Sequence, residues 1–210
     1  MPLDLLDSPK GCGDGFLRVW DLKNGSIHKY FDAHAPNGVL CLDVKGHLLA
    51  SGSTGESVKV WDTSKDYECT MSVTGDFQAA WCVKLIPSSL LVGCEDFSVL
   101  SFSLSTSELL FRLIGHSAPV RALLSLNGNI YSGSDDGTIR VWSMKRDGDD
   151  RGDRGNGRKR EGLMCVGILK GHNGGVRGLE RVGSCVMSAS VDGTMRCWDL
   201  ETGEIILHSL

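Results

Sequence analysis

The sequence predicts an all-β fold, a β-propeller of four-stranded antiparallel blades. An aromatic residue, tryptophan in all repeats but one, recurs at intervals of about forty residues along the chain. Each interval contains short alternating runs of Val, Ile, Leu and Ser, and Gly, Asp and Asn residues separate these runs as turns. Helical spacing of apolar residues is absent. Four strands repeated at a fixed period are typical of propeller blades.

The composition excludes several other classes of protein. The chain has 210 residues, 41% of them hydrophobic, and 27 glycines. It is too long for a disulfide-stapled mini-domain, and no apolar run approaches the roughly 20 residues that span a bilayer. The formal net charge of -4 disfavours a groove for nucleic-acid phosphates. We therefore expect no membrane contact and regard a nucleic-acid partner as the weaker hypothesis.

The eight cysteines include no C-x-x-C pair. We expect free thiols in a reducing compartment, and no metal or cofactor site with the required ligand spacing. The first residues lack the basic start and the long apolar stretch of a signal peptide. These observations favour an intracellular protein, cytoplasmic or nuclear.

Five repeats are predicted, in the order of their aromatic residues. These equivalent residues are Trp20, Trp61, Phe102, Trp142 and Trp198. The last interval is longer because residues 145–162 form a charged, glycine-rich insertion, which we expect to be a disordered loop. Without the insertion the period of about forty is restored.

Strands can be assigned within each repeat. The first repeat lacks an innermost strand, and residues 3–11 are a poor substitute for its second strand. The second repeat begins with strands at 39–44 and 47–53, and the third bears its aromatic strand within 92–104. The fourth is the clearest, with strands at 119–126, 129–134, 138–144 and 163–170. In the fifth, residues 203–210 follow the tryptophan strand as an outer strand.

These assignments give four full blades and one partial blade in a single propeller domain over residues 1–210. Seven blades would need about 280 residues. The chain is therefore a fragment of a larger propeller, a small closed ring or an open array, and we favour the fragment because the first repeat lacks its innermost strand. In a closed ring the strand at 203–210 would join the first blade.

The repeats carry Gly-His pairs at Gly115–His116 and Gly171–His172, and four aromatic strands end in VWDL, VWDT, VWSM and CWDL. On these motifs the sequence resembles the WD-repeat family over about residues 11–210. The resemblance implies a non-enzymatic scaffold or adaptor that docks partner peptides on one face of the propeller. It implies no small-molecule substrate.

A set of His, Ser, Asp and Trp recurs at fixed spacing. It consists of His116, Ser132, Asp136 and Trp142 in the fourth repeat, of His172, Ser188, Asp192 and Trp198 in the fifth, and in part of His34, Ser51 and Trp61 in the second. A hydrolase needs one nucleophile, so repetition favours a structural network over a catalytic triad. Gly55 stands in place of Asp in the second repeat. The third repeat has Val92 and Phe102 in place of Ser and Trp, so both blades should depend more on packing.

Partner-binding residues follow from the resemblance. Family members commonly recognise peptides through the residue 21 positions before the Trp and through the residue before the turn Asp. The first position gives Leu40, Trp81, Arg121 and Arg177, and the second gives Gly13, Thr54, Glu95, Asp135 and Val191. Of these we expect Trp81, Arg121, Arg177, Glu95 and Asp135 to bind a partner. Trp and Arg are frequent interface hot spots, and the arginine fork matches a carboxylate or phosphate.

Several alternatives remain open for these residues. A receptor for acidic or phosphorylated peptides, as in F-box WD-repeat subunits of ubiquitin ligases, would use both arginines, although Glu95 and Asp135 would repel phosphate. The two arginines could instead pair internally with neighbouring acids. An RNA- or DNA-associated complex would use the basic residues of the insertion.

Overall fold

The computed structural model describes residues 7–144, 163–199, 202 and 204–209. The described residues form nineteen strands and one short 3-10 turn, Thr63–Lys65. The predicted insertion at 145–162 lies outside them. The strands form five antiparallel sheets, one of three strands and four of four, and each sheet follows the order of the chain. The predicted class, all-β with four full blades and a partial one, is confirmed.

The sheets are as follows. The first contains β1 (Asp7–Gly11), β2 (Phe16–Asp21) and β3 (Ile27–Asp32). The second contains β4 (Val39–Lys45), β5 (Leu48–Ser53), β6 (Ser57–Asp62) and β7 (Glu68–Thr74). The third contains β8 (Ala80–Ile86), β9 (Ser89–Cys94), β10 (Val99–Ser103) and β11 (Leu109–Leu113). The fourth contains β12 (Val120–Leu126), β13 (Asn129–Ser134), β14 (Thr138–Met144) and β15 (Leu163–Lys170). The fifth contains β16 (Val176–Val182), β17 (Cys185–Ser190), β18 (Met195–Asp199) and β19 (Ile205–Ser209).

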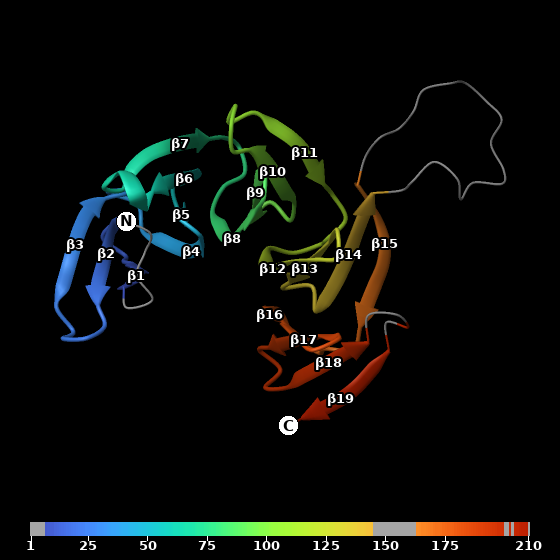
Figure 1. Cartoon of the computed structure of the whole chain (residues 1–210). Helices are drawn as coiled ribbons and strands as arrows, with labels where there is room; N and C mark the ends of the chain where they lie inside the picture. The colour runs from blue at the N-terminus through green and yellow to red at the C-terminus, as the bar shows by residue number, and fades with distance from the viewer. Residues whose placement is uncertain (1–6, 145–162, 200–201, 203, 210) are drawn as a thin grey trace, which may run out of the picture.

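The sheets follow one another along an open arc (Figure 1). The strands β4, β8, β12 and β16 line its inner side, while β3, β7, β11, β15 and β19 form the outer rim. The first described strand, β1, belongs to the sheet at one end of the arc, and the last, β19, to the sheet at the other end. In the part of the chain that is described, the sheets do not close into a ring.

The prediction for the first blade was wrong in one respect. Residues 7–11, judged a poor second strand, form β1 and pair with β2 from Asp7 opposite Asp21 to Gly11 opposite Leu17. Among the described residues β1 is an edge of its sheet, where the missing N–H of Pro9 is tolerated. The innermost strand is absent from this sheet within the described ranges, as expected.

The predicted outer strand at the end of the chain is confirmed. β19 pairs with β18, with Met195 opposite Ser209 and Trp198 opposite Ile205. It therefore completes the fifth sheet and does not join the first, as it would in a closed ring.

The apolar core lies between neighbouring sheets. Every residue of β9 and β10 is buried, because the third sheet is covered on both faces. Trp142 of β14, for example, belongs to the same buried cluster as Leu91 and Val99 of the third sheet. This packing holds the strand ends, and the side chains on them, in fixed relative positions.

Candidate functional site

The predicted polar network is assembled in the fourth and fifth sheets. His116 Nε2 lies 2.8 Å from Ser132 Oγ, and Trp142 Nε1 donates to the same oxygen at 2.8 Å. The other ring nitrogen, Nδ1, lies 2.7 Å from Asp136 Oδ2. The fifth sheet repeats these contacts through His172, Ser188, Asp192 and Trp198 at 2.7 to 3.0 Å.

The protonation state of this network follows from its partners. Burial lowers the pKa of His116, although the hydrogen bond to Asp136 opposes the shift. Burial opposes ionisation of Asp136, but hydrogen bonds from Thr138 and His116 hold its pKa below the usual range. A neutral ring therefore donates from Nδ1 to the Asp136 carboxylate and accepts at Nε2 from the Ser132 hydroxyl. Every polar group of the set then has a partner, and the serine is buried against a tryptophan rather than presented to a substrate.

The second blade contradicts the prediction of an incomplete network. His34 Nε2 lies 2.8 Å from Ser51 Oγ, which accepts from Trp61 Nε1 at 3.0 Å. Ser57 Oγ lies 2.7 Å from His34 Nδ1 and replaces the missing carboxylate. Burial and the nearby charge of Lys59 lower the pKa of His34 to about 4. The polar tie is complete because a hydroxyl four positions before the tryptophan reaches the ring.

Sequence reasoning overlooked this hydroxyl, although a signal for it was present. The residues four positions before Trp61, Trp142 and Trp198 are Ser57, Thr138 and Thr194. In the fourth and fifth sheets the threonines bind the Asp carboxylates at 2.7 Å. In the third blade, by contrast, the rings of Phe77 and Phe102 pack with centroids 6.4 Å apart in place of the polar contacts.

The five predicted partner-binding residues lie together at one edge of three neighbouring sheets. Trp81, Arg121 and Arg177 stand near the starts of the inner strands β8, β12 and β16, and Glu95 and Asp135 directly follow β9 and β13. In each of these sheets the second strand runs antiparallel to the innermost strand, so the end of one lies beside the start of the other. The five positions therefore share an edge. We call this set the Trp–Arg ladder.

The contacts within the ladder are continuous. Trp81 Nε1 donates to Glu95, and the Arg121 guanidinium lies over the Trp81 ring, with Cζ 3.5 Å from its centroid. Arg121 Nε donates to Asp135 Oδ2 at 2.8 Å, and Arg177 Nη2 lies 3.1 Å from Asp135 Oδ1. The internal pairing considered as an alternative is therefore present. It fixes the relative orientation of these side chains.

The two arginines differ in solvent exposure. The Arg121 side chain is 13% exposed, and its Nη1 is buried without a hydrogen-bond partner in the described part of the chain. The Arg177 side chain is 47% exposed. Arg121 therefore acts as the centre of the ladder, while Arg177 is accessible at one end.

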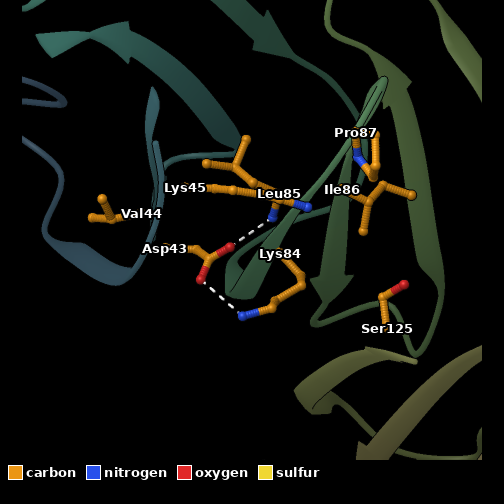
Figure 2. A pocket seen from close by; sticks show the side chains of 8 residues that line it. All are labelled: Asp43, Val44, Lys45, Lys84, Leu85, Ile86, Pro87 and Ser125. Atoms are coloured by element: carbon orange, nitrogen blue, oxygen red, sulfur yellow. Dashed lines mark hydrogen bonds and ion pairs between the residues drawn. The ribbon is translucent and has the colours of Figure 1, made fainter. Parts of the chain in front are cut away.

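A hollow of about 220 Å³ lies at the opposite ends of the inner strands (Figure 2). Asp43 of β4 reaches across it to β8, where Lys84 Nζ lies 3.0 Å from one carboxylate oxygen and the Leu85 N–H donates to the other at 2.7 Å. Its volume is below the roughly 300 Å³ of small ligand pockets. Its polar groups serve as a tie between two sheets, so the ladder is the better candidate for a binding site.

No group of three or more His, Cys, Asp or Glu side chains among the described residues could hold a metal ion. No helix in those residues has the length and apolar character needed to cross a membrane.

Repeated four-stranded blades tied by His, Ser and Trp define a WD-repeat protein. The family model of the WD domain, G-beta repeat, matches residues 25–62, 107–143 and 163–199, together more than half of the chain. The chain therefore belongs to the WD40 family. This membership supports a role as a protein-interaction scaffold.

Curated relatives agree with the family assignment. The chain is 26% identical over 200 residues to WD repeat-containing protein pop2 of Schizosaccharomyces pombe, covering 93% of this chain and 25% of that protein. It is 29% identical over 200 residues to nuclear distribution protein PAC1 of Lachancea thermotolerans, covering 91% of this chain and 39% of that protein. The chain thus spans about a quarter to two fifths of the length of these relatives.

Proposed function

We propose that this chain is a non-enzymatic scaffold or adaptor whose Trp–Arg ladder docks a peptide segment of a partner protein. The observation that supports the proposal is the continuous run of contacts from Trp81 through Arg121 to Arg177. The ladder combines the two residue types that dominate interface hot spots and mounts them on strand ends fixed by the core. All eight cysteines are free thiols, which supports an intracellular setting, cytoplasmic or nuclear.

The buried serines support the non-enzymatic part of the proposal. Ser132 and Ser188 are at most 1% exposed, and each oxygen is already engaged by an indole N–H. A nucleophile must reach its substrate, so a serine enclosed in this way is poorly suited to catalysis. The same set is repeated in neighbouring blades, as a structural element would be.

The charges in the ladder argue against phosphate as the preferred ligand. Asp135 accepts a hydrogen bond from Arg121 and forms an ion pair with Arg177, and Glu95 Oε2 lies 4.0 Å from Arg121 Nη2. A phosphate dianion would meet these carboxylates at close range. The receptor for phosphorylated peptides is therefore the weaker form of the proposal. A nucleic-acid partner is weaker still, since the chain carries a net charge of -4.

The test uses a displayed library of random peptides selected on the chain, followed by fluorescence polarisation with the enriched peptides. We expect Arg177→Ala to weaken binding by at least about tenfold without changing the melting temperature, because this exposed guanidinium would contact the peptide. Arg181→Ala on the same strand β16 is the matched control and should bind as the wild type does. If no peptide is enriched, or if binding survives Arg177→Ala, the ladder is not the docking site.

A further inference from the structure

Phe97 lies in the turn between β9 and β10, at the position that follows the turn aspartate. The equivalent residues of the other repeats are Gly15, Glu56, Gly137 and Gly193, five positions before each tryptophan. All five adopt a positive φ, and that of Phe97 is 72°. Three repeats thus use glycine, which adopts this left-handed backbone without cost, whereas the third repeat uses a bulky aromatic residue.

Nothing within the turn requires a phenyl ring at this position. Phe97 is 43% exposed and belongs to none of the buried apolar clusters. The hydrogen bond of its N–H to the Cys94 carbonyl, at 3.3 Å, uses only the backbone. The side chain of Asp96 orders the turn by accepting from the backbone N–H and the hydroxyl of Ser98. A glycine would satisfy the same contacts with less strain and less exposed apolar surface.

The turn of Phe97 also contributes to the Trp–Arg ladder. Glu95, two residues earlier, accepts from the indole of Trp81, and Asp96 forms an ion pair with Arg112. Phe97 is therefore on the same turn as a ladder residue, and the two acidic side chains of this turn are both engaged. Strained residues kept at a rigid surface are frequent at ligand-binding sites.

The charges of the ladder indicate the polar part of the ligand. Asp135 Oδ2 accepts a hydrogen bond from Arg121, and Asp135 Oδ1 forms an ion pair with Arg177 without a hydrogen bond among the described residues. Arg121 is 13% exposed and its Nη1 is buried, so Arg177, at 47% exposed, is the guanidinium that a ligand can reach. One further carboxylate would pair with the exposed Arg177 guanidinium, and its single charge is repelled less by Glu95 than that of a phosphate dianion would be.

We propose that Phe97 is an apolar anchor of the docking face and that the ligand is a peptide with an apolar side chain close to a carboxylate. The apolar side chain packs on the Phe97 ring, and the carboxylate pairs with Arg177. This proposal rests on the proposed function, because it names the peptide that the ladder takes. It also explains why an exposed phenylalanine is present at a position where its positive φ is unfavourable.

The test measures fluorescence polarisation of three synthetic peptide pools of equal length on the whole chain. One pool carries Leu or Phe near Asp or Glu, one carries Asp or Glu alone, and one carries Leu or Phe near Lys. We expect the first pool to bind most tightly. Phe97→Gly should weaken that binding by at least about tenfold, while the melting temperature stays constant or rises by up to about 4 °C because the left-handed strain is relieved.

Glu56→Gly is the matched control, since Glu56 is exposed at the same turn position of another blade with φ 59°. It should change the melting temperature in the same direction and leave peptide binding unaltered. Phe97→Asn, which also tolerates the left-handed region, should weaken binding as Phe97→Gly does.

Three results would overturn the proposal, and they can be told apart. If Phe97→Gly and Phe97→Asn bind as the wild type does while Arg177→Ala does not, the ladder docks peptides without the ring. If the lysine pool binds best, the ligand chemistry is wrong. If no pool binds the wild-type chain, the proposed function fails together with this inference.

Discussion

At the residue scale, single serine hydroxyls hold the blades' polar ties together. Ser132 Oγ accepts from Trp142 Nε1 and donates to His116 Nε2, so one oxygen satisfies two buried partners. The first repeat lacks this serine, because Lys10 occupies its sequence position ten residues before Trp20. The Trp20 indole Nε1 is buried and has no hydrogen-bond partner among the described residues. Buried N–H groups without acceptors are costly, so the serine contributes more than its size suggests.

Replacing this serine gives a direct measurement of that contribution. Ser132→Ala leaves the indole and imidazole nitrogens without their partner, and we expect a loss of about 2–3 kcal/mol in the free energy of unfolding. Ser101 is the matched control, since it is also 0% exposed in a strand but its Oγ has no hydrogen-bond partner among the described residues. Ser101→Ala should be neutral or stabilising. Equal losses in urea unfolding would contradict the role assigned to the network.

The lowered pKa of the buried His34 allows a prediction of how acid changes the stability of the fold. The pKa of His34 is lowered to about 4, so between pH 6.5 and 4 the unfolded chain binds a proton that the folded chain does not. Stability is therefore greatest above pH 6.5 and falls as the pH drops through this window, by at most about 1.4 kcal/mol per unit for each such histidine. Urea titrations at several pH values measure the slope. His34→Gln should flatten the slope, because it removes the buried imidazole.

At the scale of strands, the repeat pattern predicted most of the fold. The four strands expected in the fourth repeat lie within one residue of those observed, because turn residues bound each of them. The strand β1 was missed because Pro9 and its polar neighbours have low strand propensity, and pairing with β2 overrides that preference. The equivalent positions also predicted which five residues meet in the ladder. Whether Arg121 pairs with Asp135 or remains free depends on rotamers set by Trp81, which spacing does not encode.

Close approach between neighbouring sheets requires a glycine at one position of the second strand. A Cβ on Gly133 of β13 would lie 2.7 Å from Val176 Cγ1 and 3.1 Å from Val176 Cβ in the inner strand β16. We expect Gly133→Ala to lower the free energy of unfolding by about 1–3 kcal/mol through overpacking.

The control for this substitution is Gly167 of β15, where a Cβ would meet Val141 Cγ2 at an ordinary 3.7 Å. Gly167→Ala should be neutral, or stabilising by up to about 1 kcal/mol, because it restricts the unfolded chain. Chemical denaturation of both variants provides the comparison. Similar losses of unfolding free energy for Gly133→Ala and Gly167→Ala would show that β13 and β16 are not packed too closely for a Cβ at Gly133.

At the scale of the whole molecule, the open arc gives the fifth sheet a free face. In the fourth sheet, Ile139 is 0% exposed because it lies against the fifth sheet together with Val176 and Val186. Met195 occupies the equivalent position of the fifth sheet, three residues before its tryptophan, and is 50% exposed. It lines a mainly apolar hollow of about 370 Å³ with Leu179, Val182 and Met187. Exposed apolar surface of this kind promotes association.

We therefore expect residues 1–210 to associate reversibly as the protein concentration rises, and Met195→Lys to suppress that association. The substituted side chain lies on an exposed face, so the melting temperature of the dilute protein should change little. Ile139→Lys introduces the same charge at the buried equivalent position and should unfold the chain, which verifies that the two faces differ. Light scattering over a concentration series, with a melt of each variant, makes the measurement. A wild-type chain that stays monomeric throughout would show that this face does not drive association.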